Sequence, residues 1–177
     1  IGDMPPALIA LGARLTLRKD KQRRTIALED FFIAYGKQDR APGEFVEAVR
    51  VPLPAPGAHF AVYKVSKRRD EDITATLGAF HVTVENGVVS SARIAYGGMA
   101  ATPKRARAVE AALLGQPWAP ETVEAAQATY AQDYQPLTDM RASAEYRLLA
   151  AKNLLLRFFM ETTGTARPFT VKRYEDA

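Results

Sequence analysis

The dipeptide Asn86-Gly87 lies between two segments with strand character, residues 76–85 and 88–96. Both central positions of a type I′ turn need positive φ, and Asn followed by Gly adopts that conformation readily. These segments therefore predict an antiparallel hairpin, and residues 60–65 predict a third strand before it. A three-stranded antiparallel sheet is thus the first constraint on the fold.

Helical segments follow these strands and do not alternate with them. Proline suits the first turn of a helix, and it opens the helices predicted at residues 103–114 and 120–130. The longest predicted helix covers residues 142–161, where Asp139 or Ser143 can cap the exposed amides. Apolar residues recur along it at helical spacing: Leu148, Leu149, Leu155, Leu156 and Phe159. Strands first and helices afterwards indicate an α+β fold, in which helices back the sheet.

Residues 1–56 form a separate region that precedes the sheet. The elements predicted for it are a helix at 5–11, a hairpin at 14–18 and 24–28, a helical turn at 29–32 and a strand at 45–51. Three prolines and Gly57 then give the clearest domain-boundary signal in the chain. We therefore expect a second domain over residues 58–165 and a tail over 166–177. Because the chain begins at Ile1, we expect it to be the C-terminal part of a longer protein.

Composition excludes several kinds of site. The chain contains no Cys, so it can hold no disulfide, no cysteine-ligated iron–sulfur cluster and no thiol nucleophile. His59 and His81 have neither the spacing of metal ligands nor a partner motif for a catalytic triad. No apolar run approaches the ~20 residues of a membrane span, and no signal peptide is visible. We expect a cytoplasmic protein with no membrane segment and no metal site.

Residues 63–73, with the sequence YKVSKRRDEDI, combine four basic and three acidic side chains. The net charge of the chain is +4, but acidic neighbours neutralise its densest basic run. Binding of nucleic acid would require a basic face of one sign, so we expect no nucleic-acid partner. The residues alone leave two readings of this segment open: a solvated loop, or a loop that meets a charged cofactor.

The pair Gly97-Gly98 follows a predicted strand and lets the backbone approach another group closely. Two interpretations stay open: the pair lets the backbone approach a ligand, or it bends the chain from strand to loop. The pair lacks the full glycine-rich fingerprint of a dinucleotide-binding site, so a Rossmann site is not indicated.

Three stretches together resemble the flavoprotein part of the molybdenum hydroxylases, a family that includes the xanthine dehydrogenases. They are IGDMPPALIALGARLTL at residues 1–17, YKVSKRRDEDI at 63–73, and YGGMAATPKRA at 96–106 followed by DMRASAEYRL at 139–148. The resemblance implies that residues 1–56 are the C-terminal part of an FAD-binding domain. Residues 58–165 would then be the small C-terminal domain of the same flavoprotein.

The resemblance also implies a function in electron transfer. In such an enzyme, electrons from the hydroxylation of hypoxanthine or xanthine at a molybdopterin centre pass through 2Fe–2S clusters and FAD to NAD. The clusters and the molybdopterin would lie outside this chain. Its partners would be the N-terminal remainder of the same subunit and a large molybdenum-binding subunit. Two alternatives stay open: the medium FAD subunit of a carbon monoxide dehydrogenase or another molybdenum hydroxylase, and a non-catalytic domain that docks subunits.

The resemblance assigns no catalytic residue to this chain, but it implies residues that contact the cofactors. Those that would contact FAD are Asp3, Val46 and Lys64, and those that would line the flavin and the approach of NAD are Tyr35, Arg68 and Glu71. A cation at Lys64 would stabilise the reduced, anionic flavin. Val46 departs from the family pattern, in which Leu is familiar at this position.

Overall fold

A computed structural model describes residues 2–165 and confirms the α+β class. Its central element is an antiparallel sheet with the strand order β6-β7-β8-β9. The strands are β6 (Ala58–Val65), β7 (Thr76–Glu85), β8 (Val88–Gly97) and the two-residue β9 (Lys104–Arg105). Asn86 and Gly87 have φ of 52° and 77°, as the predicted turn between β7 and β8 requires. The predicted sheet is present, and β9 adds a short fourth strand to it.

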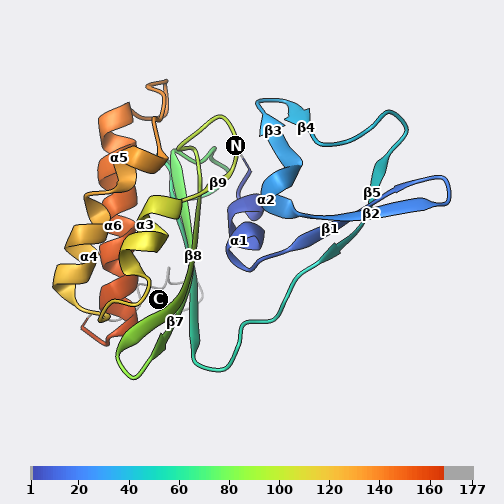
Figure 1. Cartoon of the computed structure of the whole chain (residues 1–177). Helices are drawn as coiled ribbons and strands as arrows, with labels where there is room; N and C mark the ends of the chain where they lie inside the picture. Colours follow the sequence, from blue (N-terminus) through green and yellow to red (C-terminus); the bar gives the residue numbers. More distant parts are fainter. Residues whose placement is uncertain (1, 166–177) are drawn as a thin grey trace, which may run out of the picture.

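Four helices cover one face of this sheet (Figure 1). They are α3 (Arg107–Leu113), α4 (Pro120–Gln127), α5 (Tyr130–Asp133) and α6 (Ala144–Thr162). The helix predicted from residue 103 begins four residues later, because β9 first pairs with the end of β8. The helix predicted at 120–130 is interrupted and forms α4 and α5.

The longest helix, α6, lies close to its predicted position. The hydroxyl of Ser143 accepts a hydrogen bond from the amide of Tyr146 at 3.2 Å, so Ser143 caps the helix. Among residues 2–165 no helix, α6 included, is both long enough and apolar enough to cross a membrane.

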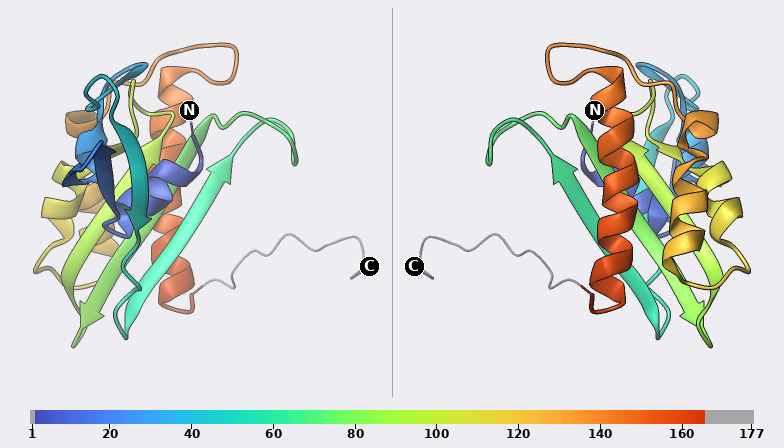
Figure 2. Two further views of the ribbon diagram at one scale, coloured as in Figure 1. Left: turned by 90° about the vertical axis from the view of Figure 1, so that its right-hand side faces the viewer. Right: turned by 90° about the vertical axis from the view of Figure 1, so that its left-hand side faces the viewer.

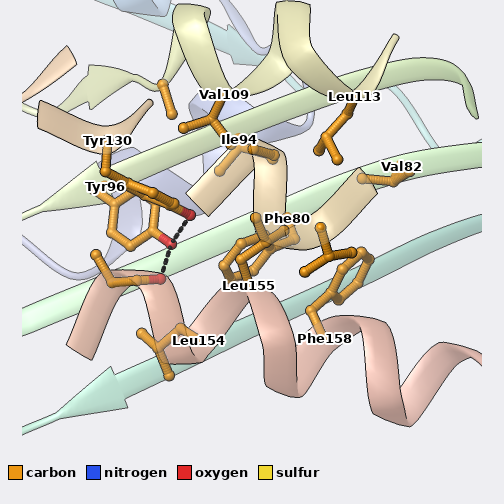
Figure 3. Close-up of a cluster of buried hydrophobic side chains, with 14 of the residues drawn as sticks. Phe80, Val82, Ile94, Tyr96, Val109, Leu113, Tyr130, Leu154, Leu155 and Phe158 are labelled. Carbon is orange, nitrogen blue, oxygen red and sulfur yellow. Dashed lines mark hydrogen bonds between the residues drawn. The ribbon is translucent and has the colours of Figure 1, made fainter. Parts of the chain in front are cut away.

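The core between sheet and helices is rich in aromatic rings (Figure 3). Phe80 of β7 stacks on Phe158 of α6 with their ring centroids 5.1 Å apart. The hydroxyl of Tyr96 lies 2.7 Å from that of Tyr130 and donates to a carbonyl of α6 at 2.9 Å, so these buried polar atoms are satisfied. A Cβ at Gly78 would lie 2.9 Å from the rings of Phe80 and Tyr96, which explains the glycine within β7.

The first region packs on the opposite face of the sheet, where α1 lies against β7 and β8 (Figures 1 and 2). Its elements are α1 (Met4–Ala10), β1 (Arg14–Lys19), β2 (Gln22–Ala27), α2 (Leu28–Phe31), β3 (Phe32–Ala34), β4 (Lys37–Gln38) and β5 (Phe45–Arg50). These include every element predicted here, together with the unpredicted ribbon of β3 and β4. Ala95 of β8 joins the apolar cluster formed by Ile9, Leu15, Leu17 and Phe31, so the two regions share this core.

A group of charges reinforces this contact. The carboxylate of Glu29 in α2 accepts hydrogen bonds from Arg93 at 2.5 Å, Arg105 at 3.1 Å and Arg107 at 2.9 Å. Arg93 also donates to the carbonyl of Ile9 at the end of α1 at 2.8 Å. Burial raises the pKa of Glu29, but Arg105 and Arg93 outweigh it and hold this pKa below its ordinary value. The carboxylate therefore stays charged at neutral pH and ties α1 and α2 to the sheet.

The apolar face of α6 differs in part from the predicted one. The structure buries Leu154, Leu155, Phe158 and Phe159 but leaves Leu149 58% exposed. Leu156, which was also predicted for that face, is 38% exposed. Leucines occur at consecutive positions along the helix, so sequence spacing alone fits more than one face. Packing against Phe80 of β7 selects the face that contains Leu155 and Phe158.

Substitution of Leu155 by Ala should lower the free energy of unfolding by about 2–5 kcal/mol, because it empties a fully buried site. The matched control is Leu149→Ala in the same helix, which should change it by less than about 0.5 kcal/mol. Chemical denaturation of both variants measures the difference. Equal destabilisation by the two substitutions would contradict the assignment of the buried face.

Candidate functional site

The side chains of Asp3 and Lys64 meet at the boundary between the two regions. Asp3 precedes α1, and Lys64 lies near the end of β6, 61 positions later. The Lys64 ammonium donates to Asp3 Oδ2 at 2.7 Å. The hydroxyl of Thr74 donates a short hydrogen bond to Asp3 Oδ1. Two residues that were predicted separately to contact FAD are therefore in direct contact with each other.

The Asp3 carboxylate is ionised at neutral pH. Partial burial raises its pKa, but the hydrogen bonds from Lys64 and Thr74 and the charge of Lys64 outweigh this effect, so the pKa lies below its ordinary value. Both members of the pair remain partly exposed. The pair is thus a local zwitterion on an accessible surface, and solvent screens its contribution to stability.

Residues 66–75 connect β6 to β7 and project beyond the edge of the sheet (Figure 2). Asp72 organises this loop, since its carboxylate accepts hydrogen bonds from the amides of Arg68 at 2.8 Å and Ile73 at 3.0 Å. The bond from the Arg68 amide is the main reason why the pKa of Asp72 lies below its ordinary value. The carbonyl of Asp72 accepts from Lys64 at 2.8 Å, which links the loop to the Asp3 pair.

Charged side chains of this loop form hydrogen bonds that hold it in place. The guanidinium of Arg68 donates to the carbonyl of Glu71 at 2.9 Å, and Glu71 has a φ of 49°. Lys67 donates to the carbonyl of Met140 at 2.6 Å and so reaches the segment before α6. The mixed charges therefore give the loop a defined shape, which neither reading of the sequence required.

The Gly97-Gly98 pair brings the end of β8 against this loop. Gly98 has a φ of 79°, and a Cβ there would collide with the carbonyl oxygen of Ala75. A Cβ at Gly97 would lie 3.4 Å from the carbonyl oxygen of Gly2. The close approach that the pair permits is thus an approach to the protein's own backbone, at Ala75 next to Thr74 and at Gly2 next to Asp3.

The other predicted contacts lie outside the cluster. Val46 is in β5 and is 40% exposed, and Tyr35 is 85% exposed in the turn between β3 and β4. Within residues 2–165, no hydrogen bond, ion pair or ring contact joins Tyr35 to Asp3 or Lys64. The structure brings together Asp3, Lys64 and the loop that carries Arg68 and Glu71, and leaves Val46 and Tyr35 apart from them.

The sequence analysis missed three residues that shape the site. Asp72 belongs to the charged run but was given no role, Thr74 lies just beyond that run, and Arg147 of α6 donates to the carbonyls of Ala75 and Gly98. A Thr that follows an acidic run, or an Arg within a helix, carries no distinctive signal in a single sequence. Among residues 2–165 there is no group of three or more His, Asp or Glu side chains that could hold a metal ion.

Comparisons with known proteins match both regions. Residues 61–162 match the CO dehydrogenase flavoprotein C-terminal domain, and residues 1–54 match the FAD binding domain in molybdopterin dehydrogenase. A nicotinate hydroxylase of Emericella nidulans is 31% identical over 90% of this chain and 12% of its own length. A xanthine dehydrogenase/oxidase of Gallus gallus is 32% identical over 67% of this chain and 9% of its own length.

A solved structure shares the fold. Carbon monoxide dehydrogenase from Hydrogenophaga pseudoflava superposes with a TM-score of 0.82 at 33% identity, over 88% of this chain and 54% of that chain. This chain therefore spans about half the length of the solved chain and a much smaller part of the two relatives. From the profile matched by residues 61–162, the chain belongs to the flavoprotein family of the molybdenum hydroxylases, the family of the CO dehydrogenase flavoprotein C-terminal domain.

Proposed function

We propose that this chain is part of the FAD-binding subunit of a molybdenum hydroxylase and serves in electron transfer. The observation that carries the proposal is the cluster of Asp3, Lys64 and Thr74. The cluster joins the region that matches an FAD-binding domain to the region that matches a flavoprotein C-terminal domain. A cofactor that both domains hold would be expected at such a boundary.

The chemistry of these side chains fits a flavin. An ammonium has three N–H donors, and Asp3 and Asp72 accept two of those of Lys64. The remaining donor suits a carbonyl oxygen or ring nitrogen of a flavin, and the Asp3 carboxylate suits a hydroxyl or N–H group. Val46 would add apolar contact. When bound, FAD would supply hydride and single-electron chemistry.

The residues of this chain would bind the cofactor and set the local field. Lys64 would hold positive charge beside the bound group, and Asp3 would fix the ammonium in place and offset part of its charge. The loop of residues 66–75, held by Asp72, would border the approach of the electron acceptor. Arg68, Glu71 and Tyr35 would lie on this acceptor side.

The finer proposal is a cytoplasmic xanthine dehydrogenase with NAD as the acceptor and a domain boundary near Gly57. The Gallus gallus relative supports the xanthine type. So do the three acidic residues that, with Ile73, follow the basic pair Arg68-Arg69 in the segment Asp70-Glu71-Asp72-Ile73. In that enzyme, 2Fe–2S clusters and a molybdopterin would lie on the remainder of the subunit and on a large subunit. The solved carbon monoxide dehydrogenase favours the alternative, the medium subunit of an enzyme of that type.

The complete protein that carries this chain should purify with FAD, whereas these 177 residues alone should hold it weakly. The reason is that the sequence has no glycine-rich phosphate-binding loop, and pyrophosphate contacts anchor a dinucleotide. Absorbance at flavin wavelengths and titration with FAD measure both. A complete protein that binds no FAD, or a 177-residue chain that retains a full equivalent, would contradict this account.

Substitutions at the two charges should move the flavin potential in opposite directions. In the complete protein, Lys64→Met should lower the midpoint potential by about 20 mV, since it removes about 1 kcal/mol of stabilisation of the reduced anion in a partly solvated site. Asp3→Asn should raise the potential by a similar amount, because it removes the anion that offsets Lys64. Spectroscopic redox titration measures both shifts.

The matched control is Lys21→Met in the exposed turn between β1 and β2, which also removes one positive charge. It should leave the potential unchanged, because solvent and salt screen a distant surface charge. Shifts of the same sign for Asp3→Asn and Lys64→Met, or no shift for either, would show that the pair does not border the flavin.

A further inference from the structure

Arg147 is a charged side chain enclosed in the protein. It is 2% exposed and is the largest of the fully buried side chains among residues 2–165. Its guanidinium donates a short hydrogen bond to the carbonyl of Ala75, another to the carbonyl of Gly98 at 2.9 Å, and a third to Asp139 Oδ1 at 2.7 Å. Its Nε is buried without a hydrogen-bond partner in the described part of the chain.

Stability alone explains such a residue poorly. Removing a guanidinium from water is costly, and apolar residues that replace a buried ion pair often leave a protein equally stable or more stable. The unpaired Nε adds a further cost. Arg147 provides directional hydrogen bonds, because its single planar guanidinium fixes two backbone carbonyls at defined positions.

The two carbonyls belong to the segments that flank Asp3. Ala75 directly follows Thr74, whose hydroxyl donates to Asp3, and it ends the loop of residues 66–75. Gly98 follows Gly97, where a Cβ would lie 3.4 Å from the carbonyl oxygen of Gly2, the residue before Asp3. Arg147 lies in α6 on the helical side of the sheet and therefore contacts both segments that support the Asp3–Lys64 site.

Asp139 fixes the guanidinium in turn. Its Oδ1 accepts hydrogen bonds from the amides of Arg141 at 2.8 Å and Ala142 at 3.3 Å as well as from Arg147. The bond from the Arg141 amide, with those from Ala142 and Arg147, lowers the pKa of Asp139 to about 2, so it is ionised throughout the neutral range. Asp139, Arg147 and the Ala75 carbonyl thus form a continuous chain of contacts that ends beside Thr74.

We propose that Arg147 is a positioning residue for the flavin site: it holds the ends of the 66–75 loop and of β8 so that Thr74 and Lys64 meet Asp3. The inference rests on the proposed function for the identity of the cofactor. It also makes a claim about the cofactor-free protein, namely that the loop keeps its shape because of Arg147.

The experiment compares Arg147→Lys and Asp139→Asn in the complete protein. A Lys keeps the charge but cannot span two carbonyls and a carboxylate, and Asp139→Asn leaves the core filled if Arg147→Lys fails to fold. In the FAD-free protein, both should speed hydrogen exchange of the amides of residues 66–76 by about tenfold, as expected for the loss of a hydrogen bond to a charged group. Both should also weaken FAD binding by about tenfold.

The matched control is Asp133→Asn, which disturbs another carboxylate that accepts hydrogen bonds from backbone amides, those of Ala108 and Val109 in α3. It should lower the melting temperature without changing exchange of residues 66–76 or FAD affinity per folded molecule. Thr74→Val provides a second test: if Arg147 acts through Thr74, the double variant with Arg147→Lys should bind FAD no more weakly than the weaker single variant.

Unchanged exchange of residues 66–76 in Arg147→Lys and Asp139→Asn would overturn the inference, as would the same loss of FAD affinity in Asp133→Asn. So would fully additive losses in the double variant with Thr74→Val. If the unsubstituted protein binds no FAD, the proposed function fails, whereas the exchange measurement still decides whether Arg147 holds the loop.

Discussion

The contact between Glu29 and three arginines determines how the two regions of this chain meet. Arg93 and Arg105 come from the sheet and Glu29 from α2, so the contact holds the first region against the face of β7 and β8. Charge pairs of this kind fix the orientation of the two regions, while the shared apolar cluster around Ala95 removes apolar surface from water. With this contact in place, Asp3 lies in hydrogen-bonding contact with Lys64, although 61 positions separate them in the sequence.

The same arrangement explains why the site is built from both regions. Asp3 belongs to the first region and Lys64 to the second, and their ion pair crosses the boundary between them. The loop of residues 66–75 then closes around Asp72, and Arg147 supports it from behind. A site assembled in this way suits a cofactor held between two domains.

The sequence was sufficient for much of the fold but for less of the site. Asn86-Gly87 located the hairpin, and the order of strands and helices gave the class, because turn chemistry and periodicity are local signals. The buried face of α6 was partly wrong, since only packing against Phe80 distinguishes Leu155 from Leu149. Resemblance pointed to Asp3 and Lys64, but their mutual contact, the role of Thr74 and the enclosure of Arg147 depend on tertiary structure.

The central claim is that a flavin lies where the two regions meet. The most direct measurement is a crystal structure of the complete protein with FAD bound. The account predicts the isoalloxazine ring within hydrogen-bonding or van der Waals distance of Lys64 and Asp3, with residues 66–75 along its border. An FAD molecule bound elsewhere, with the Asp3–Lys64 pair facing only solvent, would contradict it.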